Sequence, residues 1–129
     1  MPNSNHLLTH LALALAAATA QAQTANYCDG RVVPSSTYST LNEMGYGAGS
    51  RVSYHMELQN QSTDSVRYTV QFTAPNILDA QNGSVAANLA SKRSQHVNLG
   101  RQIFPRDPTA RGKLSLADVI RYTRVTCSN

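Results

Sequence analysis

Two neighbouring stretches in the middle of the chain alternate between apolar and polar residues, and this pattern limits the possible folds more than any other feature. In residues 51–60, four apolar side chains fall on one face: Val52, Tyr54, Met56 and Leu58. In residues 66–74, every second residue is again apolar. A period of two is typical of a half-buried β-strand. Because only residues 61–65 separate the two stretches, we predict that they pair as an antiparallel hairpin.

The rest of the chain carries weaker strand patterns between turn-forming residues. They predict strands at residues 27–33, 85–90, 95–104 and 122–126, and loops at residues 34–50, 75–84 and 105–113. In the strand at 95–104, Val97, Leu99 and Ile103 are expected to share one face. Ser115 and Asp118 have the S-x-x-D spacing of a helix start. We expect one helical turn at 115–121, although a strand fits this stretch almost as well.

About six or seven short strands without a long helix indicate an all-β fold, and we predict an antiparallel immunoglobulin-like β-sandwich. A small β-barrel is the alternative. The chain has no tryptophan, and its two cysteines lie near its ends, so the Cys…Trp…Cys core of immunoglobulin domains is missing. In architecture alone, the layout resembles small immunoglobulin-like periplasmic chaperones and accessory proteins.

Residues 1–22 have the pattern of a cleaved signal peptide. The stretch from Leu11 to Ala20 is uncharged, and Ala20-Gln21-Ala22 matches the small-x-small site of a signal peptidase. This apolar run is shorter than the ~20 residues that a membrane-spanning helix needs. A buried N-terminal helix is the alternative. We therefore expect a single domain over residues 23–129, periplasmic or secreted, with no transmembrane segment after cleavage.

Cys28 and Cys127 stand at the two edges of that domain. An exported chain meets an oxidising environment, so we expect the two thiols to form a disulfide. A closed loop of ~100 residues would stabilise the fold by ~4.7 kcal/mol in the chain-entropy model. A pair of metal-binding thiols is the alternative, but the usual C-x₂-C spacing is absent.

We find no motif that predicts catalysis, a metal ion or any other cofactor. Ser53, His55 and Glu57 follow the order of a hydrolase triad, but successive residues on one strand face stand ~6.6 Å apart, beyond hydrogen-bond reach. His55 and His96 could hold zinc together with Glu57 if their strands were neighbours. No local spacing supports that site, so we expect both histidines to be ordinary surface residues.

Charge is distributed unevenly along the predicted domain. Residues 23–91 carry three basic and five acidic side chains, whereas residues 92–129 carry eight basic and two acidic ones. If the eight share a face, they form a site for an anionic surface; otherwise they are a solvated surface. They are Lys92, Arg93, Arg101, Arg106, Arg111, Lys113, Arg121 and Arg124. Tyr38 and Tyr46, in the predicted loop at 34–50, are further candidate binding residues, since tyrosine, serine and glycine are typical of binding loops. An ordinary mobile loop and an edge strand are the alternatives there.

The function that these features favour is an exported, non-catalytic binding or assembly module. Its partner would be a protein or an anionic envelope component such as lipopolysaccharide or an acidic glycan, and export argues against nucleic acid. One alternative is a structural subunit of a surface appendage or envelope complex, assembled by strand donation. A second alternative is a small hydrolase or metal-dependent enzyme.

Overall fold

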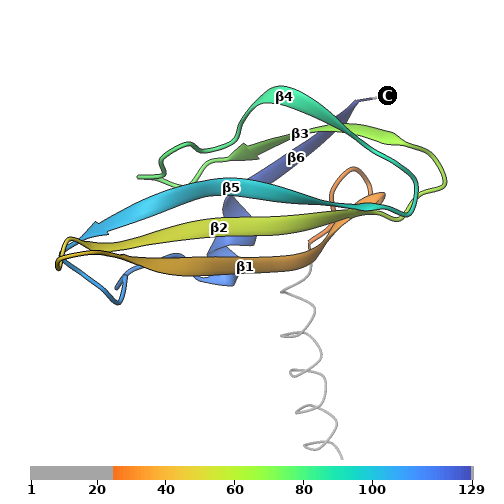
Figure 1. Ribbon diagram of the computed structural model, residues 1–129. Helices are drawn as coiled ribbons and strands as arrows, with labels where there is room; N and C mark the ends of the chain where they lie inside the picture. The colour runs from red at the N-terminus through yellow and green to blue at the C-terminus, as the bar shows by residue number, and fades with distance from the viewer. Residues whose placement is uncertain (1–24, 129) are drawn as a thin grey trace, which may run out of the picture.

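The computed structural model describes residues 25–128, so the predicted signal peptide lies outside the described residues. Within them, six strands form two antiparallel sheets that face each other, with a short helix at one side (Figure 1). The strand orders are β1-β2-β5 and β4-β3-β6, and no ladder between described strands closes the sheets into a barrel. These orders match A-B-E and C′-C-F of immunoglobulin-like domains. The predicted antiparallel sandwich is therefore confirmed.

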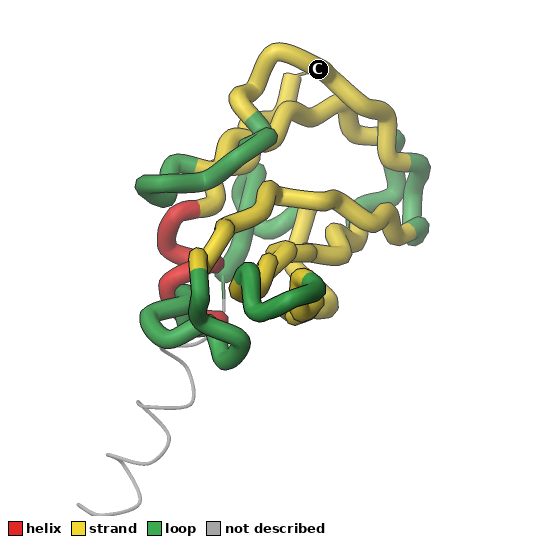
Figure 2. The backbone as a smooth tube through the Cα atoms, turned by 60° about the vertical axis from the view of Figure 1, so that its left-hand side comes forward, coloured by secondary structure: helices red, strands yellow, loops and turns green. Residues whose placement is uncertain are grey.

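The first sheet has long strands, with β2 at its centre. It consists of β1 (Val32–Met44), β2 (Gly49–Asn60) and β5 (Ser94–Pro105). The second sheet is shorter and has β3 at its centre. It consists of β4 (Asn82–Leu89), β3 (Val66–Phe72) and β6 (Thr123–Ser128). Figure 2 shows the two layers of strands, with the helix beside them.

The helix α2 (Leu116–Tyr122) begins where the S-x-x-D spacing predicts it. The hydroxyl of Ser115 accepts a hydrogen bond from the backbone N–H of Asp118 over 3.1 Å, which satisfies one free donor of the first turn. β6 begins at Thr123, directly after the last residue of the helix. None of the helices among residues 25–128 combines the length and apolar character that crossing a bilayer would require.

The core lies between the central strands, and the period-two pattern predicts its members correctly. The side chains of β2 that point inward are fully buried: Val52, Tyr54, Met56 and Leu58. The inward side chains of β3 and of the residues that follow it are also buried: Val66, Tyr68, Val70, Phe72 and Ala74. Burial of these side chains supplies most of the hydrophobic stabilisation of the fold.

The predicted hairpin between residues 51–60 and 66–74 is wrong. β2 pairs with β1 and β5, whereas β3 pairs with β4 and β6, so the two strands lie in different sheets. Their apolar faces are turned toward each other across the core instead of lying side by side. Residues 61–65 cross from one sheet to the other. Alternation reports which face of a strand is buried, and it does not report which strand is its neighbour.

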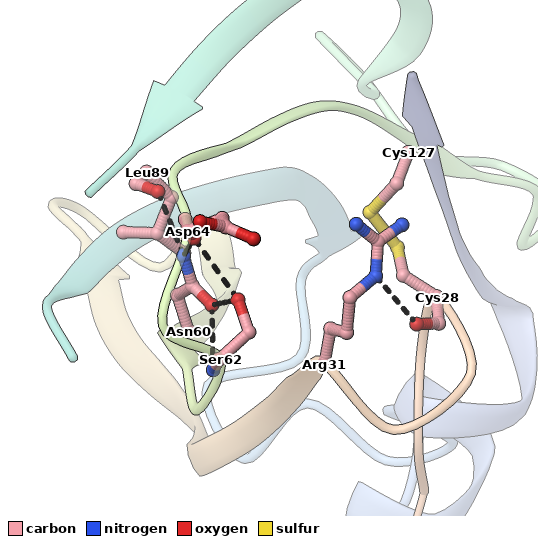
Figure 3. Close-up of a disulfide and its surroundings, with 7 residues drawn as sticks. All are labelled: Cys28, Arg31, Asn60, Ser62, Asp64, Leu89 and Cys127. Carbon is pink, nitrogen blue, oxygen red and sulfur yellow. Dashed lines mark hydrogen bonds between the residues drawn. A yellow bond between two sulfur atoms is a disulfide. The ribbon is translucent and has the colours of Figure 1, made fainter. Parts of the chain in front are cut away.

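Asn60 holds this crossing in place. Its side chain is fully buried, and its amide donates hydrogen bonds to the carbonyl oxygens of Asp64 (2.8 Å) and Leu89 (2.9 Å). Its side-chain oxygen accepts hydrogen bonds from the N–H and the hydroxyl of Ser62 (Figure 3). A single buried amide thus links the end of β2, the crossing and the end of β4.

The predicted loop at 34–50 is also wrong, because most of it is the edge strand β1. Only residues 45–48 form the turn to β2. β1 is rich in serine and threonine and carries few apolar side chains, so its sequence lacks the alternation of a half-buried strand. The edge position explains this composition, since β1 has one strand neighbour among residues 25–128, and α2 packs against it.

Three smaller predictions also need correction. The predicted strand at 27–33 is mostly a turn, bracketed by a bridge between Tyr27 and Val32. The predicted loop at 75–84 ends earlier, because β4 begins at Asn82. Ile103 does not share the inner face with Leu99, because β5 contains a bulge that reverses the alternation.

The disulfide between Cys28 and Cys127 is present, with 5.7 Å between the two Cα atoms (Figure 3). It joins the turn that precedes β1 to strand β6 and therefore links the two sheets. Its loop spans 99 positions of the chain, which is nearly the whole described domain. The side chain of Arg31 lies beside it and donates a hydrogen bond to the carbonyl oxygen of Cys28.

Candidate functional site

The face of the first sheet that points away from the core, which we call the outer face, is polar and holds the candidate site. β2 contributes every second residue to it: Arg51, Ser53, His55 and Glu57. The strand register places side chains of β1 and β5 beside them: Tyr38, Thr40, His96, Asn98 and Arg101. Three strands thus bring together side chains from distant parts of the chain.

A hollow of about 450 Å³ lies on this outer face. Its lining comes from β2, β5 and the segment before β4: Arg51, Ser53, Asp79, Gln81, Asn98, Gly100 and Arg101. The guanidinium of Arg101 forms an ion pair with the carboxylate of Asp79 over 2.9 Å. The side-chain amide of Gln81 donates a hydrogen bond to the carbonyl oxygen of Asn98 over 3.1 Å. The lining is therefore mostly polar and capable of hydrogen bonding.

A bulge in β5 and a glycine shape this hollow. The ladder with β2 shifts between Tyr54 and His55, so Asn98 and Arg101 both point outward although they are three positions apart. Gly100 lies between them with a φ of +147°, a conformation that side chains disfavour. A Cβ at this position would also collide with the side chain of Ile77. Glycine therefore permits the segment before β4 to approach β5.

The electrostatics of the hollow favour an anion. Two basic residues, Arg51 and Arg101, line it together with one acidic residue, Asp79. Nε of Arg101 is buried and has no hydrogen-bond partner among the described residues. The Asp79 side chain is 74% exposed, so water weakens its pairing with Arg101. The hollow thus has an excess of positive charge.

A cluster of rings lies next to the hollow on the same face. Nδ1 of His55 is 3.0 Å from Nε2 of His96, and Nε2 of His55 is 3.2 Å from the hydroxyl of Thr40. The ring of Tyr38 stacks on that of His55 with 4.8 Å between centroids. Burial, and then the nearby His96, lower the pKa of His55 below its usual value. His55 thus forms hydrogen bonds with Thr40 and His96, and not with Ser53 and Glu57, as a hydrolase triad would require.

The basic residues that the sequence singles out do not gather in one place. Lys92 and Arg93 lie at the turn before β5, whereas Arg106, Arg111 and Lys113 follow its far end. β5 has 12 residues, and at about 3.3 Å per residue its ends are about 36 Å apart. Arg121 lies on α2 and Arg124 on β6. Of the eight, only Arg101 lines the hollow.

The two candidate tyrosines are also separated. Tyr38 lies on the outer face beside His55, whereas Tyr46 is fully exposed in the turn between β1 and β2. Sequence reasoning missed Arg51, Asp79 and Gln81 as members of a site. The outward residues of β2 have the composition of any solvent-facing strand, and only the bulge brings Arg101 beside them. One signal in the sequence pointed to this site: Arg101 interrupts the apolar pattern of residues 95–104.

No known protein family, curated protein or solved structure gives a significant match to this chain.

Proposed function

We propose that this protein is an exported, non-catalytic binding module that holds an anionic group of an acidic glycan in the hollow between Arg51 and Arg101. The observation that carries the proposal is the pair of guanidiniums over a polar hollow with a single carboxylate. A guanidinium presents a planar fork of donors that matches a carboxylate or phosphate with two parallel hydrogen bonds. The Arg101 side chain is 41% exposed, so its guanidinium can present outward N–H groups to such an anion.

The surroundings of the hollow favour a sugar over an isolated ion. Gln81 and Asn98 carry amides and Ser53 carries a hydroxyl, which are groups that hydrogen-bond to sugar hydroxyls. The exposed ring of Tyr38 lies farther along the same face and offers an apolar surface for a neighbouring sugar unit. This combination suits a chain of sugar units with acidic groups.

Export and the absence of catalysis are parts of the same proposal. The disulfide favours an oxidising compartment, in agreement with the predicted signal peptide at residues 1–22. The hydrogen bonds that join His55 to Thr40 and His96 support a binding role, because they leave no imidazole among residues 25–128 in place to activate Ser53.

The test is a calorimetric titration of the protein with trigalacturonate, with neutral maltotriose as the matched sugar. We expect trigalacturonate to bind and maltotriose to bind far more weakly. Arg51→Ala and Arg101→Ala should each weaken binding about tenfold or more, since each removes a charge-assisted pair. Raising the salt concentration should weaken binding further.

Arg124→Ala is the matched control, because it removes the same charge from the exposed face of β6 in the other sheet. Arg51→Lys keeps the charge and loses the planar fork, so it should bind less well than the wild type. Equal losses in Arg124→Ala and Arg51→Ala would show a diffuse charge effect. Such a result, or equal binding of both sugars, would refute the proposed site.

A structural subunit that assembles through strand edges is the second candidate. β4 and β6 each have a strand neighbour on one side only among the described residues, and Val85 on β4 is 74% exposed. Such edges can accept a strand from another chain. Sedimentation that shows concentration-dependent assembly, abolished by Val85→Lys, would favour this candidate. A strictly monomeric protein at high concentration would exclude it.

A further inference from the structure

His55 and His96 form a pair that the anion-binding proposal does not use. They lie on adjacent strands, where His55 is opposite Asn98 and His96 is opposite Glu57, so the two rings meet diagonally across the β2–β5 ladder. The ring centroids are 5.1 Å apart. The condition that the sequence left open, neighbouring strands for these two histidines, is therefore met.

The distance between the two facing nitrogens fits a shared metal ion. Nδ1 of His55 and Nε2 of His96 are 3.0 Å apart. Two imidazole nitrogens that each lie about 2.0 Å from one ion are separated by about 2.8 Å at a right angle and by about 3.3 Å at a tetrahedral angle. The observed spacing falls between these values. The geometry points to a binding site for a divalent transition-metal ion, Cu²⁺ above all, between Nδ1 of His55 and Nε2 of His96.

The surroundings of His55 already hold its ring in a metal-binding orientation. With its proton on Nε2, the ring donates to the hydroxyl of Thr40 over 3.2 Å and leaves the Nδ1 lone pair free. Hydrogen bonds of this kind orient metal-bound imidazoles in proteins. Tyr38 stacks on the ring at 17° between planes and restricts its rotation. Both partners come from β1, so the neighbouring strand supports the ligand.

Metal binding would replace the hydrogen bond between the two rings. With the His55 proton on Nε2, Nδ1 of His55 is the acceptor in that hydrogen bond and Nε2 of His96 is the donor. When the ion binds, the His96 proton moves to Nδ1 of the same ring, and neither neutral imidazole changes its charge. The ion then takes the place of one shared proton between two nitrogens.

The ligand set decides which metal is favoured. No group of three or more histidine, cysteine, aspartate or glutamate side chains among residues 25–128 could hold a metal ion. Water would therefore fill the other positions, and a site with two imidazoles in adjacent positions suits Cu²⁺ or Ni²⁺ better than a closed zinc site. Affinity should follow the general order of divalent ions, with Cu²⁺ above Ni²⁺ and Zn²⁺.

The test is a titration of the full protein with Cu²⁺. Calorimetry measures the stoichiometry and the affinity, and electron paramagnetic resonance identifies the nitrogen ligands. We expect one ion per chain and a nitrogen coupling pattern from two imidazoles. His55→Asn and His96→Asn should each lower the affinity about tenfold or more and leave one imidazole in the spectrum. Thr40→Val should cause a smaller loss, and Thr40→Ser should restore the affinity.

For the uncleaved chain, His6→Asn/His10→Asn is the matched control, because these two histidines of the predicted signal peptide are the remaining ones of the sequence. This double variant should bind one Cu²⁺ as the wild type does. Circular dichroism should confirm that each variant keeps the fold. The inference fails if His55→Asn/His96→Asn binds Cu²⁺ with unchanged affinity, or if the wild-type spectrum shows a single imidazole. Arg51→Ala should leave Cu²⁺ binding intact, which separates this site from the proposed anion site.

Discussion

The β1–β2–β5 sheet is built from strands of 13, 12 and 12 residues, whereas the strands of the β4–β3–β6 sheet have 8, 7 and 6 residues. Both sheets contribute one buried face to the same core. Their outer faces differ, because the hollow and the ring cluster both lie over β2 and its neighbours. The long sheet thus combines a structural face with a candidate binding face.

This difference indicates a division of roles within one small domain. A long, regular sheet holds side chains from three strands in fixed relative positions, which a binding site needs. The short sheet covers the other side of the core and has fewer backbone hydrogen bonds of its own. We infer that the short sheet depends on links to the long one, namely the disulfide and Asn60.

The largest expected effect comes from removing the disulfide. Cys28→Ala/Cys127→Ala should lower the free energy of unfolding by about 2–5 kcal/mol, because the unfolded chain gains the entropy of a loop that was closed. Denaturant unfolding measures the loss. Amide hydrogen exchange should show that β6 loses more protection than β2, since β6 carries Cys127. Equal loss of protection in both strands would contradict the division between the sheets.

Asn60→Ala should have the second largest effect and lower the free energy of unfolding by about 2–3 kcal/mol. The substitution removes the Asn60 donor from the buried carbonyl oxygen of Leu89, and it leaves the carbonyl oxygen of Asp64 with the hydroxyl of Ser62 alone. Asn88→Ala on β4 is the control, because this asparagine is exposed. Thermal unfolding of the two variants gives the comparison. Equal stability of both would mean that the crossing does not depend on the buried amide.

Much of the architecture could be predicted from local patterns. Alternation correctly identified the buried faces of β2 and β3, because burial acts on each residue separately. The spacing of Ser115 and Asp118 located the helix, since capping is a contact between near neighbours. The cysteine pairing followed from there being two cysteines in a chain predicted to be exported.

Strand pairing and the site could not be predicted in the same way. Which strand lies beside β2 depends on how the whole core packs, and the short connection at 61–65 suits a hairpin as well as a crossing between sheets. The hollow depends on the bulge in β5 and on the close approach of the chain at Gly100. The contact of His55 with His96 depends on the same pairing. These features arise from tertiary structure, and no local motif encodes them.

Two tyrosines, one from each sheet, provide a finer comparison. The hydroxyl of Tyr54 in the long sheet donates to Gln102 over 2.7 Å and accepts a hydrogen bond from the backbone N–H of Leu114 over 2.9 Å. The hydroxyl of Tyr68 in the short sheet donates to Gln95 over 2.6 Å. Tyr54→Phe should therefore cost about 1.5 kcal/mol and Tyr68→Phe about 0.5–1 kcal/mol. A larger loss of unfolding free energy for Tyr68→Phe than for Tyr54→Phe in denaturant unfolding would show that the short sheet depends more on its tyrosine hydrogen bond.

The last comparison concerns alkaline pH at the junction of the two sheets. Tyr27 precedes the disulfide, and its hydroxyl lies 3.8 Å from the sulfur of Met56 on β2. Burial raises the pKa of Tyr27 to about 12. In the unfolded chain a tyrosine has a pKa of about 10. The folded state therefore keeps this proton more tightly. The stabilisation that results is present below about pH 10 and is lost as the pH rises toward about 12.

Tyr27→Phe cannot ionise, so its free energy of unfolding should fall less steeply over this range than that of the wild type. Urea unfolding at a series of alkaline pH values measures the two slopes, and ultraviolet absorbance of tyrosinate gives the titration directly. Identical slopes would mean that the phenol beside the disulfide is already open to water, and that the junction between the sheets is looser than its contacts indicate.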